Sequence, residues 1–295
     1  MKGSILFLGF LASITSAASL TEVCSVGYCT LNGGTKGGAG GATTTASSLT
    51  ALQTAVADDV ARIVVVSGTI TGNVAVAVGG NKSVIGLKGA TLSGVGLRVL
   101  GKPNVIIRNL IITKCLVPID NIGNQLSTNV WDYYDGLIDI THTTDYITIS
   151  NTYFHDHWKG TLVGHSDNNQ AEDTGHLRIT YYQPHFKNVY SRGPSLRFGT
   201  GYVINGWYED MEGAVNTCLG AQILVENTVF SGITKCIIST DVGYAVLKNS
   251  DLGGGTNSAP TSTGTLNSVP YTYSLVPLAS TTAVVGANQG AILSF

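Results

Sequence analysis

Two kinds of charged residue gather in one part of this chain. Asp135 and Asp139 lie four residues apart, and Lys159, Arg192 and Arg197 follow in the same stretch, residues 135–199. All six histidines also fall there, although only 12% of the 295 residues are charged. Carboxylates are ligands for hard cations such as Ca²⁺, and Lys and Arg bind carboxylates. The set suits a polyanionic substrate held through a bridging cation and by direct contacts.

Calcium binding by both aspartates requires a bend in the chain. On a regular strand, Asp135 and Asp139 share a face but stand roughly 13 Å apart, whereas calcium ligands lie about 2.3–2.6 Å from the ion. Gly136 between them is suited to such a bend. Two alternatives stay open: solvated turn aspartates, and ion pairs of the two arginines with acids such as Glu172 or Asp173.

Other kinds of site are disfavoured by spacing. The His155-Asp-His157 motif lacks the spacing of zinc proteases, and no serine stands in a Gly-x-Ser-x-Gly elbow. The Gly-rich stretch 33–46 lacks the ending of a phosphate-binding loop. A net charge of -2 gives no attraction to nucleic acid or to a membrane surface. We therefore expect most histidines to be packed or hydrogen-bonded, and we expect no nucleic-acid or membrane partner.

The N-terminus predicts secretion. A basic start, an apolar run from Ile5 to Ile14 and small residues after it are typical of a signal peptide, and the run is too short to span a bilayer. We expect residues 1–19 to be the signal peptide and residues 20–295 to be one catalytic domain. In an oxidising compartment Cys24 and Cys29 can close a small loop. Cys218 and Cys236 can pair if the fold brings them together, and Cys115 is expected to be a buried free thiol.

The elements that must position these residues are short strands in a repeat. Hydrophobic residues make up 43% of the chain, and Gly, Thr, Val and Ile run throughout. An asparagine followed three residues later by an apolar or aromatic residue recurs with a spacing near 22 residues. This period without intervening helices predicts a solenoid of parallel strands. The corner positions are Asn109, Asn151, Gln183 (a degenerate copy), Asn205, Asn227 and Asn249.

Asparagine tolerates left-handed turns and can form a ladder with the next rung. Strands are predicted at 63–66, 83–86, 105–112, 147–154, 177–182, 202–207, 223–229 and 245–248. One helix is predicted after Ser47-Ser48, from the spacing of Leu49, Leu52 and Val56. The interval from Asn151 to Gln183 carries about ten extra residues, which we place in a loop at Gly164–Gly175; such insertions commonly build sites.

The motifs also resemble a known family, the extracellular pectate lyases of the pectate/pectin lyase superfamily in their fungal form. The resemblance covers essentially the whole mature chain. It is carried by Asp135-Gly-Leu-Ile-Asp-Ile-Thr-His142, Asp145-Tyr-Ile-Thr-Ile-Ser-Asn151, His155-Asp-His-Trp-Lys159, Leu162-Val-Gly-His-Ser-Asp167, Glu172-Asp-Thr-Gly-His-Leu-Arg178 and Ser191-Arg-Gly-Pro-Ser-Leu-Arg-Phe-Gly199.

The resemblance implies a right-handed parallel β-helix and calcium-dependent β-elimination of polygalacturonate or pectin by a secreted enzyme, which we expect to be monomeric. Asp135 and Asp139 would then be calcium ligands, Lys159 and Arg197 would bind uronate carboxylates, and Arg192 would abstract the C5 proton. Neutralising the C6 carboxylate acidifies the adjacent C5–H. A guanidinium is ordinarily protonated, so the base role of Arg192 rests on the resemblance.

One departure from the family pattern falls just before the aspartates. Relatives carry a calcium-binding Asp in a Trp-x-Asp-His motif, followed by an acidic loop. Here Trp131 is followed directly by Asp132-Tyr-Tyr-Asp135. Asp132 is a candidate third ligand, although it can equally be the acid that precedes Tyr-Tyr in relatives. Two alternatives follow: a pectin lyase acting on methyl-esterified substrate without calcium, and a weakly active or non-catalytic pectin-binding isoform.

Overall fold

The computed structural model describes residues 18–99, 101–114, 136–260 and 264–295. Several sequence predictions lie outside them: the signal peptide up to residue 17, the thiol of Cys115, and the segment from Trp131 to Asp135 with the candidate ligands Asp132 and Asp135.

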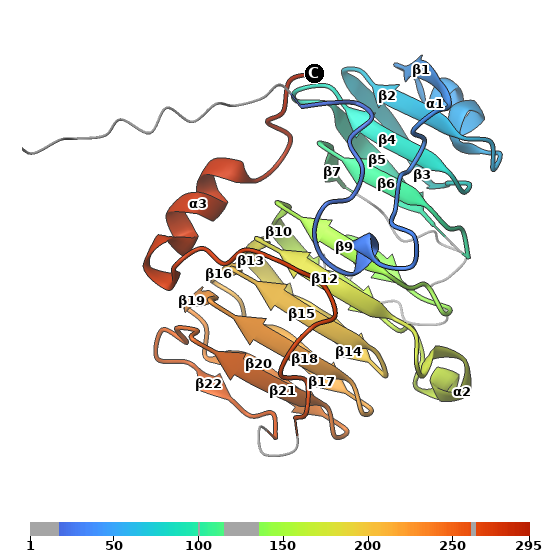
Figure 1. The fold of residues 1–295 in the computed structure, drawn as a ribbon. Helices are drawn as coiled ribbons and strands as arrows, with labels where there is room; N and C mark the ends of the chain where they lie inside the picture. The colour runs from blue at the N-terminus through green and yellow to red at the C-terminus, as the bar shows by residue number, and fades with distance from the viewer. Residues whose placement is uncertain (1–17, 100, 115–135, 261–263) are drawn as a thin grey trace, which may run out of the picture.

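Every pairing of named strands is parallel, and successive turns of the chain stack into a column (Figure 1). The first rungs form two sheets. One sheet has the order β1-β2-β4-β6 and the other β3-β5-β7. Their strands are β1 (Ala42–Ala46), β2 (Arg62–Val66), β3 (Thr69–Ala77), β4 (Lys82–Gly86), β5 (Thr91–Arg98), β6 (Val105–Arg108) and β7 (Ile111–Thr113).

The later rungs form three sheets, and most of these rungs contribute one strand to each sheet. The five-stranded sheet contains β9 (Ile147–Ser150), β12 (Arg178–Tyr182), β15 (Thr200–Ile204), β18 (Gln222–Glu226) and β21 (Tyr244–Lys248). The four-stranded sheet contains β10 (Tyr153–Lys159), β13 (His185–Ser191), β16 (Trp207–Glu209) and β19 (Val229–Ser231). The six-stranded sheet contains β8 (Ile138–Ile140), β11 (Thr161–Val163), β14 (Ser195–Arg197), β17 (Gly213–Cys218), β20 (Lys235–Thr240) and β22 (Thr256–Asn257).

The predicted parallel β-helix with rungs of about 22 residues is confirmed. However, none of the predicted strands lies in the six-stranded sheet. Its strands β8, β11 and β14 have three residues each, too few for an alternating pattern to stand out. Their place in the sheet comes from pairing with neighbouring rungs, as Leu162 pairs with Asp139 on one side and with Ser195 on the other.

The repeated asparagines occupy the corners between strands, as predicted. All five, and Gln183, have positive φ angles between 44° and 57°, a left-handed conformation that asparagine adopts more readily than most residues. The Nδ2 of Asn249 donates to the Oδ1 of Asn227 over 2.7 Å. The Nδ2 of Asn205 donates to the carbonyl of Asn227 over 3.2 Å, and both Asn205 and Asn227 also donate to the carbonyl of Val276, in the C-terminal segment.

Aromatic side chains stack through the interior, one from each rung. Phe154, Phe186, Tyr208 and Phe230 follow one another with ring centroids 4.3, 5.1 and 4.8 Å apart. All four are at most 2% exposed. The rungs are therefore joined both by strand pairing and by a continuous apolar column.

The predicted helix is α1 (Leu49–Val56), beside the first rungs (Figure 1). The Ser48 hydroxyl accepts from the Ala51 amide, and Leu52 and Val56 are fully buried. The expectation of one helix was wrong, because α2 (Gln170–Asp173) and α3 (Thr281–Asn288) are also present. In α3 the buried residues are Thr281 and Val285, too few for an apolar stripe. The described residues also form three short 3₁₀ turns: η1 (Tyr28–Thr30), η4 (Asp167–Asn169) and η5 (Leu278–Ser280).

The C-terminal segment returns along the corners of the column towards the first rungs (Figure 1). Val276 contacts the corners at Asn205 and Asn227. Further on, the Gly290 amide donates to the carbonyl of Asn151, and Leu293 exchanges two hydrogen bonds with the Asn109 side chain. We call residues 276–293 the C-terminal strap.

The structure answers whether the two cysteine pairs suggested by the sequence form disulfides. Cys24 and Cys29 form a disulfide, whereas Cys218 and Cys236 are buried free thiols. Gly213 pairs with Lys235, so Cys236 lies opposite the start of β17 and Cys218 at its far end. Four residues along a strand correspond to roughly 13 Å, well beyond the Cα separation of a disulfide. Within the described residues, no helix is long and apolar enough to cross a membrane.

Candidate active site

Asp139 lies on β8 and is exposed. Its carboxylate turns towards Gly136, since a Cβ added to that glycine would stand 2.6 Å from the Asp139 Oδ1. Because Gly136 has no side chain, the Asp139 carboxylate has room to lie beside it. The bend expected between Asp135 and Asp139 stays a prediction, because residue 135 lies outside the described residues. Among described residues, no three His, Cys, Asp or Glu side chains form a metal-binding cluster.

Lys159 ends β10 and pairs in register with Ser191. Its carbonyl is 3.0 Å from the Nδ1 of His157. Arg192 follows Ser191, at the corner that leads from β13 to β14, with φ of 65°. The carbonyl of Arg192 accepts from the Thr161 amide over 2.7 Å. Lys159 and Arg192 therefore come from neighbouring rungs, and neither forms an ion pair with a described residue.

Arg197 ends β14 and is held by the predicted insertion. Between β11 and β12 the chain forms a loop that contains η4 and α2. From this loop, Asp167 accepts from the Arg197 Nε over 2.6 Å, and Gly164 accepts from its Nη1 over 3.0 Å. The guanidinium is thus fixed on one edge.

The alternative partners proposed from sequence, Glu172 and Asp173, do not bind the arginines. Asp173 is buried and accepts from the Thr143 amide, while Glu172 lies near His142 and accepts from Asn169. Sequence reasoning missed Asp167 as a partner of Arg197, although Asp167 ends one of the motifs quoted above.

A hollow of about 330 Å³ lies over the six-stranded sheet. Its lining includes Arg192, Arg197, Ser195, Asn216, Glu212 and Lys235. Three cations against one carboxylate make this hollow positively charged. Lys159 and Asp139 are not among the described residues of its lining, but Asp139 belongs to the same sheet, two strands from Ser195.

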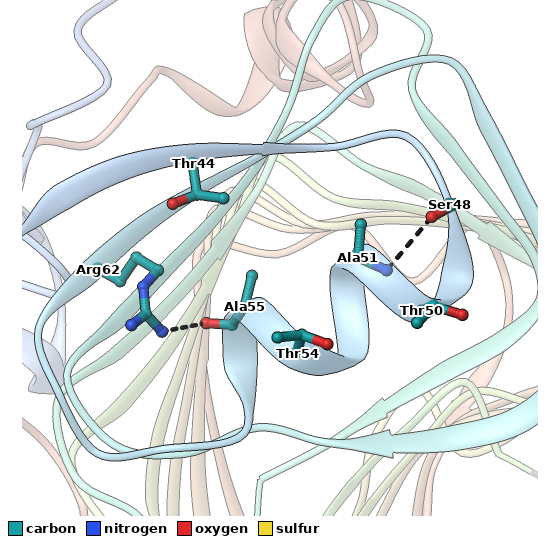
Figure 2. A pocket seen from close by; sticks show the side chains of 7 residues that line it. All are labelled: Thr44, Ser48, Thr50, Ala51, Thr54, Ala55 and Arg62. Carbon is teal, nitrogen blue, oxygen red and sulfur yellow. Dashed lines mark hydrogen bonds between the residues drawn. The ribbon is translucent and has the colours of Figure 1, made fainter.

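A larger hollow, of about 570 Å³, lies between α1 and the first strands (Figure 2). Its lining is mostly Thr and Ala. Arg62 is engaged there, because its Nη1 donates to the Ala55 carbonyl over 2.7 Å and its guanidinium pairs with Asp58. This larger hollow contains no group suited to catalysis. We therefore take the smaller, positively charged hollow as the candidate active site.

The histidines are packed or hydrogen-bonded, as expected. His142 stacks on His165 with centroids 4.2 Å apart. His155 pairs with Asp156, and His176 lies 3.6 Å from Asp145. His185 is buried between Tyr153 and Trp207, and it contacts Glu209. Burial lowers the pKa of His185, although its ring nitrogens lie within hydrogen-bond distance of the acceptor oxygens of Glu209 and Gln289.

Comparisons of the sequence and of the structure with known proteins all find pectate lyases. A family model described as pectate lyase matches residues 123–291, more than half of the chain. The probable pectate lyase A of Neosartorya fischeri is 52% identical, covering 91% of this chain and 88% of its own. Pectate lyase A of Aspergillus niger is 47% identical over 99% of this chain and 96% of its own. A Bacillus pectate lyase, solved in complex with trigalacturonate, has a TM-score of 0.75, 27% identity and coverage of 90% and 98%.

The parallel β-helix and these similarities define the chain as a polysaccharide lyase. Within that class it belongs to the pectate lyase family, which confirms the resemblance drawn from the motifs. The alignment with the probable pectate lyase A of Aspergillus niger spans 312 positions, more than the 295 residues of this chain. That relative therefore has residues that this chain lacks.

Proposed function

We propose that this chain cleaves polygalacturonate by calcium-dependent β-elimination, with Arg192 as the base. The single observation that carries the assignment of roles is that Arg192 and Arg197 line one positively charged hollow, on the sheet that also presents Asp139. The pectate lyase activity follows from membership of the family. The finer assignment is ours: calcium ligands Asp135 and Asp139, with Asp132 as a possible third, and uronate contacts from Lys159 and Arg197.

The donor set fits calcium. Asp139 offers a hard carboxylate oxygen that is turned towards residue 136, and carboxylates are the side chains that calcium prefers. When bound, calcium would supply positive charge to the uronate carboxylate and so acidify its C5–H. Pectate lyases typically depend on calcium. Asp135 and Asp132 enter this proposal through the sequence.

The cationic side chains of the protein would bind the substrate carboxylates and remove the C5 proton. Arg197, fixed by Asp167 and Gly164, would bind a uronate carboxylate in a defined orientation. Lys159, one rung away from Arg192, would bind another. Arg192, as the proposed base, would accept the C5 proton. The C5–H electrons then form the C4=C5 double bond, and the 4-O-glycosyl group leaves with its electron pair, without addition of water.

We further propose that residues 1–19 direct the chain out of the cell and that residues 20–295 act as one monomeric catalytic domain on extracellular pectin. A pectin lyase activity on methyl-esterified substrate is less well supported, because Asp139 and Lys159 are both present. The shortened segment after Trp131 favours a second candidate, a weakly active or non-catalytic pectin-binding protein.

Absorbance of unsaturated uronides separates these proposals. We expect product from polygalacturonate with calcium and none after addition of a chelator, with restoration by excess calcium. Cleavage of esterified pectin that is indifferent to the chelator would instead establish the pectin lyase. Binding of polygalacturonate without product would establish the non-catalytic protein, and reducing ends without the chromophore would overturn all three.

A further inference from the structure

We propose that Lys235 forms an additional uronate-binding position in the positively charged hollow, where Glu212 competes with the substrate for the Lys235 ammonium group. This inference rests on the proposed polyanionic substrate. Lys235 lies at the start of β20, is 55% exposed, and lines the same hollow as Arg192 and Arg197. The motifs gave no reason to select it, because it stands outside residues 135–199.

Register places Lys235 in line with Arg192 along the axis of the column. The amide of Gly193, the residue after Arg192, donates to the carbonyl of Ala214 in the next rung. Gly213 in turn pairs with Lys235 in the rung beyond. Two rungs correspond to about 9.6 Å. The residue between the two cations is Gly213, which has no side chain of its own, and the Cδ1 of Ile238 lies over it.

The hollow between the two cations carries further polar groups. Asn216 pairs in register with Ser195, and its Oδ1 accepts from the Thr240 hydroxyl over 3.2 Å. Its amide hydrogens are then the part of the side chain available to sugar hydroxyls. The surface thus continues past Arg192 with donors suited to an acidic sugar chain.

Glu212 allows the direction of each mutational effect on substrate binding to be predicted. The Lys235 Nζ lies 2.9 Å from the Glu212 Oε1, and this hydrogen bond raises the pKa of Lys235. A uronate carboxylate at Lys235 must compete with Glu212 for the ammonium group and is repelled by its charge. Loss of Lys235 should therefore weaken substrate binding, whereas loss of the Glu212 charge should strengthen it.

The test compares Lys235→Gln and Glu212→Gln by KM for polygalacturonate at low ionic strength. We expect Lys235→Gln to raise KM about three- to fivefold, the size of an exposed ion-pair contribution, with the loss in KM rather than in kcat. Glu212→Gln should lower KM, and both shifts should shrink as salt is added. Lys187→Gln is the matched control, since Lys187 is 45% exposed and pairs with Glu209 on the four-stranded sheet.

Two results would overturn the proposal. Equal KM shifts in Lys235→Gln and Lys187→Gln would reduce the effect to overall charge. A rise of KM in both Lys235→Gln and Glu212→Gln would show that the pair acts only as a structural ion pair. Direct binding of polygalacturonate to the same variants gives the same comparison if the parent protein forms no product, so failure of the lyase proposal is distinguishable from failure of this one.

Discussion

At the scale of single residues, the base role of Arg192 is the most demanding part of the proposed chemistry. Arg192→Lys keeps the positive charge but shortens the reach and removes the planar guanidine. We expect turnover to fall about 10²- to 10⁴-fold, the usual contribution of a general base, with a smaller change in KM. Initial rates of unsaturated product measure this, and unchanged circular dichroism controls for folding. Normal turnover in Arg192→Lys would refute the assignment.

Asp167 is predicted to position Arg197 without contacting the substrate. In Asp167→Asn the charge-assisted hydrogen bond to the Arg197 Nε is lost, while the Gly164 carbonyl still accepts from the Arg197 Nη1. Because Asp167 is 64% exposed, we expect a loss of about 0.5–1 kcal/mol, seen as a rise in KM. Asp156→Asn, at an acid that is 68% exposed on β10, is the control. Asp167→Glu keeps the charge but lengthens the side chain, so we expect it to restore KM only in part. Full restoration would indicate a purely electrostatic role.

At the scale of elements, Asp145 joins two rungs of the five-stranded sheet. Burial raises the pKa of Asp145, but hydrogen bonds from the Arg178 guanidinium and from two backbone amides outweigh it, so its net pKa is lowered. A carboxyl with a lowered folded pKa stabilises the protein above the unfolded value, near 3.9, and this stabilisation is lost as the pH falls through the folded pKa.

We therefore expect Asp145→Asn to lower Tm at neutral pH, and we expect the difference from the parent protein to shrink below about pH 4. Thermal unfolding followed between pH 3 and pH 7, a range set around that reference pKa, measures this. Asp241→Asn, at an exposed acid in the turn after β20, serves as the control. A difference that stays constant with pH would mean that packing, not charge, is responsible.

The aromatic column contains one polar atom with no described partner, the buried hydroxyl of Tyr208. Phe186 and Phe230 occupy the same position in the flanking rungs. Tyr208→Phe removes an unsatisfied buried group, and we expect a gain of about 1 kcal/mol in the free energy of unfolding. Denaturant unfolding at constant m-value tests it. A loss of stability would indicate a hydrogen-bond partner outside the described residues.

The sequence predicted those elements whose signal is local. A corner such as Asn227 is recognisable because its left-handed backbone favours asparagine, and α1 is recognisable from Ser48 and its apolar spacing. The strands under the site were missed, because Ser195–Arg197 has only three residues and is fixed by its neighbours on both sides. The Asp167–Arg197 contact was missed for a related reason: it joins a loop and a strand 30 residues apart.

At the scale of the whole molecule, the C-terminal strap ties together rungs from both parts of the column. Asn109 is its last anchor, with two hydrogen bonds to Leu293. Asn109→Gly removes these bonds while keeping a residue that tolerates the positive φ of 57°. We expect a lower Tm and faster proteolysis within residues 289–295. Asn249→Gly, at a corner with no recorded bond to the strap among described residues, is the comparison; equal protease sensitivity would contradict the anchoring role.

The strap also has a consequence for the order in which the chain is made. A solenoid whose rungs touch only their neighbours can fold progressively from its N-terminus as synthesis proceeds. Here Asn109 finds a partner 184 residues later, close to the end of the chain. Contacts of such long sequence separation slow folding. The first rungs therefore remain incompletely covered until Leu293 has been made, and a chain stopped before that residue would leave the corner at Asn109 unprotected.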